Sequence, residues 1–139
     1  MIILDSDIFS EVFNRNATYS ARLETIPREQ QHVTIVTCEE ALQGWMSLIR
    51  QAEQKRAKTN LAHAYDLLLR SIEQLARMRI LPYTAEAHEH YLRLKSQKIR
   101  IGTRDLRIAS IALAHDATLF TRNRRDYELV PNLELEVWN

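Results

Sequence analysis

Met1-Ile2-Ile3-Leu4-Asp5-Ser6-Asp7 opens the chain with four apolar residues that lead directly into a carboxylate. A short apolar run of this kind indicates a buried β-strand, and Asp5 stands where that strand ends. A charged side chain at the end of a buried strand costs free energy unless it is paired or bound to an ion. The alternative is that Asp5 caps a following helix, which is a common use of aspartate. For Asp5 alone the two interpretations are equally supported.

The same arrangement recurs along the chain. Glu40 follows the apolar run Val33-Thr34-Ile35-Val36, and Asp105 lies at the start of a helix that begins Thr103-Arg104-Asp105-Leu106. A polar turn, 121–126, follows the run Ala117-Thr118-Leu119-Phe120. In a parallel sheet all these points lie at the carboxyl ends of the strands, where open α/β folds bind their ligands. Carboxylates gathered there repel one another unless something positive holds them, so the pattern predicts a divalent cation.

Strands and helices alternate along the whole sequence. Strands are expected at Met1–Leu4, His32–Val36, Ile80–Tyr83, Thr118–Phe120 and Leu133–Val137. Helices are expected near Asp7–Phe13, Tyr19–Ile26, Cys38–Arg56, Ala85–Ser96 and Thr103–His115, with a long amphipathic helix after Asn60. This order predicts an α/β fold with a mostly parallel sheet that is covered on both faces.

Two of these helices carry apolar stripes at helical spacing. The stripes consist of Leu42, Trp45, Met46 and Ile49 on the first helix, and Leu61, Tyr65, Leu68, Ile72 and Leu75 on the second. Such stripes are typical of helices that bury one face. The two helices are therefore expected to form an antiparallel hairpin with both stripes in the core.

Composition limits the class of protein. The chain is 45% hydrophobic and 27% charged, as in an ordinary single globular domain, and its net charge of +1 argues neither for nor against nucleic-acid binding. Basic residues nevertheless crowd the carboxylates: Lys95, Lys98, Arg100, Arg104 and Arg107 near Asp105, and Arg122, Arg124 and Arg125 near Asn123 and Asp126. Acidic residues ringed by arginine suit a phosphodiester substrate, although solvated helix faces give the same pattern.

Several kinds of site are disfavoured. Cys38 is the only cysteine, so no internal disulfide can form, and we interpret it as a packing residue. The apolar run before Asp5 is too short for a signal peptide, and no run reaches membrane-spanning length, so a soluble cytoplasmic protein is expected. Scattered histidines argue against zinc, and the lack of a glycine-rich loop argues against a nucleotide-binding loop.

Each carboxylate also has a purely local interpretation. Thr37 and Glu40 match a capping box at a helix start, and Asp105 in a first helical turn is favoured by the helix dipole. Taken singly, the local interpretation is favoured for both Glu40 and Asp105. Their convergence with Asp5 at one sheet edge favours a shared site, because independent caps have no reason to meet.

The candidate ligands are all oxygen atoms. Asn123 and Asp126 follow the fourth strand and could add a ligand or orient a water, and Thr121 could offer a hydroxyl, although such a turn is often only a turn. Carboxylate and amide oxygens suit Mg²⁺ or Mn²⁺. Such ions activate water and stabilise the charge that develops during phosphoryl displacement. The arginines that could contact substrate phosphates are Arg104, Arg122 and Arg124.

Four short motifs, in this order, resemble those of PIN-domain nucleases. They are Ile3–Asp7, Val36–Gly44, Ile101–Ala109 and Thr118–Tyr127. Their spacing and the chain length are most similar to VapC-type toxins of bacterial toxin–antitoxin pairs. The resemblance implies one PIN-like domain over residues 1–139, with a three-layer α/β/α sandwich around a parallel sheet. It also implies a Mg²⁺- or Mn²⁺-dependent endoribonuclease, often directed at tRNA or ribosomal RNA.

The same resemblance implies a set of site residues and partners. The core acidic residues would be Asp5, Glu40 and Asp105, with Thr121 and Asn123 where the family places its fourth polar group and Asp126 close behind. Metal ligands would be Asp5, Glu40, Asp105 and Asn123. Because many members carry aspartate where this chain has Asn123, the fourth ligand stays open between Asn123 and Asp126. An antitoxin protein that covers the cleft, and a homodimer, are also implied.

Three other functions compete. Asp5-Ser6-Asp7 resembles the paired aspartates of haloacid-dehalogenase-type phosphatases, but Phe9 stands where that motif requires threonine or valine. A receiver-type signalling domain would need its aspartate after the third strand, where this chain has Leu81-Pro82-Tyr83. A catalytically silent PIN-like module that binds RNA or protein is the third possibility. Gathered carboxylates argue against it, because binding alone gives no reason to bring repelling charges together.

Overall fold

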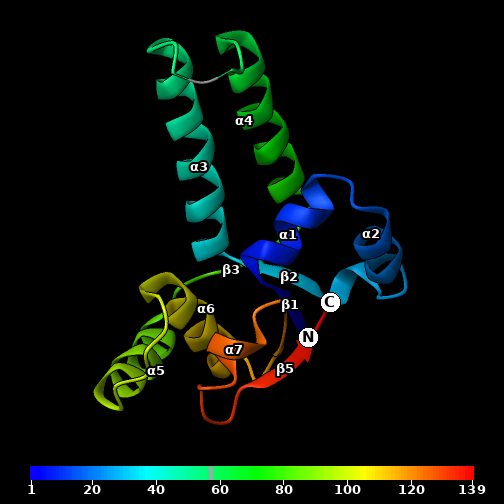
Figure 1. The fold of residues 1–139 in the computed structure, drawn as a ribbon. Helices are drawn as coiled ribbons and strands as arrows, with labels where there is room; N and C mark the ends of the chain where they lie inside the picture. The colour runs from blue at the N-terminus through cyan, green and yellow to red at the C-terminus, as the bar shows by residue number, and fades with distance from the viewer. Residues whose placement is uncertain (57) are drawn as a thin grey trace.

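The computed structural model describes residues 1–56 and 58–139, and Figure 1 shows the arrangement of their elements. The strands are β1 Ile2–Leu4, β2 Gln31–Thr34, β3 Arg79–Leu81, β4 Thr118–Thr121 and β5 Glu134–Val137. The helices are α1 Ser6–Phe13, α2 Ala17–Glu24, α3 Ile35–Glu53, α4 Leu61–Ala76, α5 Ala85–Ser96, α6 Thr103–Ala114 and α7 Arg124–Tyr127, with a 3-10 turn at Arg28–Gln30. In this part of the chain, no helix is both long and apolar enough to cross a bilayer. All five expected strands are present.

The five strands form one sheet in the order β3-β2-β1-β4-β5, and every neighbouring pair is parallel. In the centre, Ile3 lies opposite His32 of β2 and Leu119 of β4. The chain moves outward from β1 to β2 and β3, then returns to the other side of β1 for β4 and β5. The strand order therefore reverses at β1, and such a reversal leaves a crevice at the carboxyl end of the central strand.

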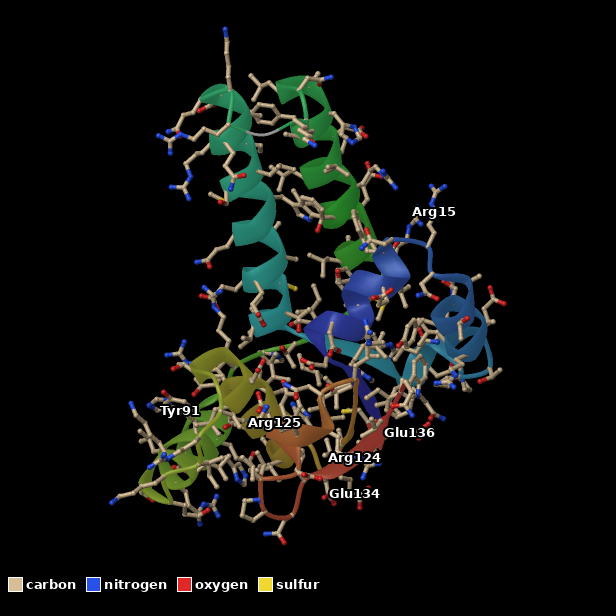
Figure 2. All side chains as sticks on the ribbon, in the orientation of Figure 1. Arg15, Tyr91, Arg124, Arg125, Glu134 and Glu136 are labelled. Atoms are coloured by element: carbon tan, nitrogen blue, oxygen red, sulfur yellow. The ribbon has the colours of Figure 1, made fainter. Side chains whose placement is uncertain are left out.

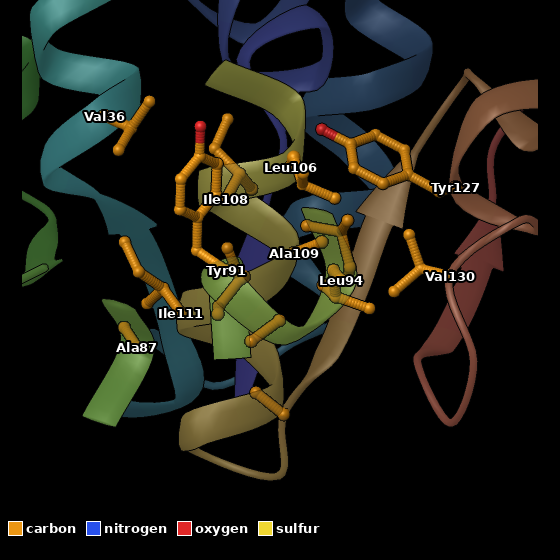
Figure 3. Packing of buried hydrophobic residues seen from close by; sticks show 14 of the residues in the cluster. Val36, Ala87, Tyr91, Leu94, Leu106, Ile108, Ala109, Ile111, Tyr127 and Val130 are labelled. Atoms are coloured by element: carbon orange, nitrogen blue, oxygen red, sulfur yellow. The ribbon is translucent and has the colours of Figure 1, made fainter. Parts of the chain in front are cut away.

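Alternate residues of the central strands enter two separate cores. Ile3 and Leu119 pack with α5 and α6, and Figure 3 shows this cluster around Ile108, Ile111 and Tyr91. Ile2, Leu4 and Phe120 pack on the other face with α1 and α2. This alternation follows from the pleat of a strand. The predicted α/β/α sandwich is confirmed.

The predicted helical hairpin forms, but the prediction that its apolar stripes are buried is wrong in part. Figure 1 shows α3 and α4 side by side, projecting away from the sheet. On α4 the inward positions are Ala64, Ser71 and Leu75. The exposed members of the predicted stripes are Met46, Leu61, Tyr65 and Ile72. Beyond the sheet α3 and α4 cover each other only in part, so several stripe residues stay in solvent, while Trp45 packs against Phe13 of α1.

The start of α3 also differs from the sequence prediction. The strand was expected to continue to Val36, with Thr37 and Glu40 forming a capping box. Instead β2 ends at Thr34, whose hydroxyl accepts a hydrogen bond from the Thr37 amide at 3.2 Å, and α3 begins at Ile35. The β-branched pair Ile35-Val36 is typical of a strand, but both residues belong to α3, in which Val36 is buried. Glu40 therefore lies one turn further into the helix and is free of any capping role.

Candidate active site

Asp5 is the buried centre of the site, with only 4% of its surface exposed. Its Oδ1 accepts hydrogen bonds from the Ser6 backbone amide at 2.8 Å and from the Tyr127 hydroxyl at 3.0 Å. Its Oδ2 accepts one from the Thr121 hydroxyl at 2.8 Å. Asp5 thus does cap α1, as the local interpretation held. It also joins β1 to β4 and α7, which a simple cap does not require.

Burial raises the pKa of Asp5 to about 7, and repulsion from Asp7 and, less strongly, from Asp105 contributes. The hydrogen bonds from Thr121 and Ser6 act in the opposite direction and lower the pKa. The charged form of Asp5 is therefore poorly stabilised by the protein alone. A cation at this position would remove that cost.

Glu40 is linked to the end of β1 through a side-chain hydrogen bond. The Ser6 hydroxyl donates to Glu40 Oε1 at 2.9 Å and lies 3.1 Å from the Thr37 hydroxyl. Burial raises the pKa of Glu40, and repulsion from Asp105 adds to this, whereas the Ser6 hydrogen bond lowers it. Glu40 therefore faces the same crevice as Asp5.

Asp105 lies in the first turn of α6, and the residue before that helix, Gly102, offers no side chain to cap it. Burial raises the pKa of Asp105, with added repulsion from Asp126 and Asp7, while a hydrogen bond with Tyr127 lowers it. These mutual effects place Asp105 in the same carboxylate cluster. The three acidic residues singled out from the sequence lie together.

Asp7 is also a member of the cluster, although from the sequence a helix cap is its favoured role and contact with a metal or water the lesser alternative. Its Oδ2 accepts a hydrogen bond from the Arg122 backbone amide at 3.3 Å. Its Oδ1 is buried and has no hydrogen-bond partner among the residues that the structure describes. Burial raises the pKa of Asp7. A buried carboxylate oxygen without a partner is costly, and it is a position that a cation would stabilise.

The turn after β4 is organised around Asn123. Its Oδ1 accepts from the Asp126 amide at 3.3 Å and caps α7, while its Nδ2 donates to Asp126 Oδ2 at 3.0 Å. The Asn123 amide donates to the Thr121 hydroxyl at 3.0 Å. In this arrangement both ends of the Asn123 side chain hold α7, and Asp126 lies close enough to repel Asp105.

Two of the candidate phosphate-binding arginines already have protein partners. Arg104 Nε lies 3.6 Å from Glu39 Oε1, and its guanidinium also bonds to Gln43, so it joins α6 to α3. Arg122 pairs with Glu11 at 2.6 Å. Both arginines lie beside the carboxylate cluster and can orient toward a phosphate only in competition with these partners.

Arg124 is exposed at the start of α7, and the neighbouring Arg125 is exposed as well. Figure 2 shows both arginines on the α7 side of the molecule. They add positive charge to the rim of the crevice, where it costs little because solvent screens it.

The donor set fits a hard divalent cation in chemistry but not yet in geometry. All the candidate ligands are oxygen atoms, which suit Mg²⁺ or Mn²⁺. Across residues 1–56 and 58–139, however, no three Asp, Glu, His or Cys side chains are already grouped closely enough to hold a metal ion. Ion binding would require side-chain rotation, which Glu40, in the second turn of α3, and Asp105, in the first turn of α6, can supply because both are partly exposed.

An apolar pocket of about 430 Å³ adjoins the carboxylate cluster. It begins at Ser6 and Glu40 and continues between α1 and α3, and its apolar walls are Phe9, Phe13, Ala41, Trp45 and Leu48. The apolar stripe on α3 predicted that Trp45 packs in the core of the hairpin, so this pocket was not expected from the sequence. The pocket depends on how α1 and α3 pack against each other, which no local sequence pattern specifies.

The metal-free protein is expected to lose stability as pH rises from about 4 to about 7. The pKa of Asp5 is raised from 3.8 to about 7 by burial, so the folded state binds more protons than the unfolded chain across this range. Stability therefore falls with rising pH, by on the order of 2–4 kcal/mol for this group. Asp7, Glu40 and Asp105, whose pKa values are also raised by burial, act in the same direction.

Thermal melts in EDTA between pH 4 and pH 8 measure this dependence. Asp5→Asn should flatten the slope, whereas Asp66→Asn, at an exposed position on α4, should leave it unchanged. A melting temperature that increases steadily over this interval in the parent protein would contradict the raised pKa of Asp5.

The fold and the cluster together define a parallel α/β/α domain with acidic residues at the carboxyl end of its central strands. The PIN domain family matches residues 2–131, and the chain belongs to that family. It is 29% identical to Ribonuclease VapC2 of Rickettsia felis, over 99% of this chain and 97% of that protein. The resemblance to PIN-domain proteins of the VapC type is confirmed.

Solved structures agree with this assignment. VapBC2 from Rickettsia felis, bound to a DNA fragment from its promoter, aligns over 100% of both chains with a TM-score of 0.75 and 26% identity. DNA-bound VapBC from Salmonella typhimurium aligns over 99% of this chain and 98% of that chain, with a TM-score of 0.80 and 19% identity. The second comparison supports the fold alone.

Proposed function

We propose that this chain is a divalent-cation-dependent endoribonuclease that hydrolyses RNA phosphodiester bonds and serves as the toxin of a toxin–antitoxin pair. The observation that carries the proposal is the set of four carboxylates, Asp5, Asp7, Glu40 and Asp105, whose pKa values are all raised by burial. Such a cluster is unfavourable without a cation. The similarity to a ribonuclease of the same family supports RNA as the substrate.

The residues take distinct roles in this proposal. Asp5, Glu40 and Asp105 hold Mg²⁺ or Mn²⁺, and the partnerless oxygen of Asp7 adds negative charge beside them. When bound, the ion supplies activation of a water and neutralises charge on the phosphoryl group. Thr121 holds Asp5 in place through its hydroxyl.

The turn after β4 and the rim complete the proposed site. Of the two candidates for the fourth ligand, Asn123 and Asp126, we favour Asp126, because both ends of the Asn123 side chain are used to hold α7. Arg104, Arg122 and Arg124 lie at the rim, where guanidinium groups can bind the flanking phosphates of an RNA strand. When RNA binds, Arg104 can exchange Glu39, and Arg122 can exchange Glu11, for phosphate oxygens. Each arginine then has an acidic partner both before and after RNA binds.

We infer an antitoxin as the protein partner, because the similar solved structure with 26% identity is a VapBC complex. The apolar pocket between α1 and α3 offers such a partner a surface directly beside the carboxylates. A segment bound there would obstruct the approach of RNA to Glu40. The proposed site of action is the cytoplasm, and a homodimer is the proposed assembly of the toxin.

A catalytically silent module that binds RNA or protein is the second candidate. Two observations favour it: the described residues hold no preformed group of three metal-binding side chains, and an apolar pocket adjoins the cluster. The two functions differ in one measurable property, which is cleavage.

The test is incubation of the purified protein, free of antitoxin, with labelled tRNA and ribosomal RNA in Mg²⁺, Mn²⁺ or EDTA. Cleavage is expected with either ion and not in EDTA. Asp105→Asn should lower the cleavage rate by roughly 10²–10³-fold, because it removes the negative charge of one of the proposed metal ligands. Asp66→Asn is the matched control and should cleave normally. RNA binding without cleavage under every ion condition would establish the silent module instead.

A further inference from the structure

Tyr127 contacts the carboxylate cluster from within the core. Its side chain is fully buried, at 0% exposure, and Figure 3 shows the ring beside Leu106 and Val130 with the hydroxyl at the far end from Val130. That hydroxyl donates to Asp5 Oδ1 at 3.0 Å. The Asn123 cap fixes the short helix α7, which carries Tyr127, so the phenol has little freedom to move.

The hydrogen bonds of Asp5 determine which oxygen remains open. A carboxylate has about four lone-pair positions, two on each oxygen. The Ser6 amide and the Tyr127 hydroxyl occupy both positions on Oδ1. The Thr121 hydroxyl occupies one on Oδ2. A single position is left, and it lies on Oδ2.

We propose that Tyr127 is a positioning residue that closes Oδ1 of Asp5, so that Asp5 can present only Oδ2 to a cation. The inference rests on the metal site proposed above. Mg²⁺ demands near-octahedral geometry, whereas Ca²⁺ is more flexible and also accepts both oxygens of one carboxylate. By closing Oδ1, Tyr127 selects for the smaller ions and against Ca²⁺.

The hydroxyl, and not the ring, carries this role. Phenylalanine would fill the same space between Leu106 and Val130, so packing does not call for an oxygen atom at this position. A buried hydroxyl also costs free energy unless it is hydrogen-bonded. The hydroxyl acts on two of the proposed ligands: it donates to Asp5 Oδ1, and its hydrogen bond with Asp105 lowers the pKa of that carboxyl.

Tyr127→Phe tests the proposal, with dissociation constants for Mn²⁺ and Ca²⁺ measured by titration calorimetry. The ratio of the Ca²⁺ constant to the Mn²⁺ constant is expected to fall by roughly tenfold, which corresponds to about 1.4 kcal/mol. Tyr91→Phe is the matched control. Tyr91 is a second buried tyrosine of the same core, with Arg107 and Lys95 over its ring, and its loss of a hydroxyl should leave the ratio unchanged.

The outcomes separate this inference from the proposed function. Mn²⁺ binding with an unchanged ratio in Tyr127→Phe would overturn the role of Tyr127 and leave the metal site intact. A parent protein that binds no Mn²⁺ would overturn both. If Tyr127→Phe does not fold, infrared spectra of the parent protein with Mn²⁺ show how Asp5 binds the ion. The carboxylate bands of Asp5 are assigned by comparison with Asp5→Asn. Coordination through one oxygen of Asp5 supports the proposal, and coordination through both overturns it.

Discussion

Replacement of Asp5 by asparagine is expected to reduce RNA cleavage by at least about a thousandfold while the protein stays folded. The loss follows because Asp5 is the most buried of the clustered carboxylates and the proposed ligand nearest the central strand. Asparagine nevertheless fits the site. Its amide oxygen can accept from Ser6 and Tyr127, which both donate to Oδ1, and its amino group can face the Thr121 hydroxyl, which can act as acceptor.

Stability distinguishes a lost charge from a lost fold in this variant. Without metal at pH 8, Asp5→Asn removes a poorly stabilised negative charge, so its melting temperature should equal or exceed that of the parent. With Mn²⁺ added, the parent should gain stability by mass action and the variant should gain much less. Asp66→Asn should behave as the parent in both conditions. Normal cleavage by Asp5→Asn would remove Asp5 from the catalytic site.

The sequence was sufficient to predict the order of elements and the type of sheet. Buried strands in this chain, such as Met1–Leu4 and Thr118–Phe120, are apolar runs bounded by polar residues, and that pattern is local. The boundary at Ile35-Val36 could not be predicted in the same way. Both residues favour strands by their branched side chains, yet the Thr34 hydroxyl caps a helix there by accepting from the Thr37 amide, and Val36 is buried within that helix.

The same distinction applies to the site. The convergence of Asp5, Glu40 and Asp105 was predictable, because parallel strands bring their carboxyl ends to one edge. The contribution of Tyr127 was not, since its hydroxyl reaches Asp5 only through the fold of the turn after β4. Its sole signal in the sequence is the position directly after the polar turn ending at Asp126. The partnerless oxygen of Asp7 likewise depends on how α1 packs, which spacing alone does not specify.

Gly44→Leu is expected to stabilise the fold and to weaken binding of the proposed antitoxin. Gly44 lies on α3 and lines the apolar pocket, and a Cβ added there meets no described atom within 4 Å. Leucine in place of glycine should therefore stabilise the helix, by about 0.5–1 kcal/mol. The same side chain would fill the pocket, so the dissociation constant of the antitoxin should rise by roughly 100-fold, the scale of one interface hot spot.

The control for Gly44→Leu is Arg50→Leu, which places the same side chain at an exposed position on α3 that does not line this pocket. Binding is measured by titration, and inhibition of RNA cleavage by added antitoxin gives a second readout. If Gly44→Leu still cleaves RNA but is no longer inhibited, the pocket binds the antitoxin and not RNA. A parallel loss of cleavage would show that RNA also enters the pocket, since residue 44 lies one helical turn from Glu40. Unchanged affinity would exclude the pocket from the interface, and the antitoxin would then have to act by covering the carboxylates or the arginine rim directly.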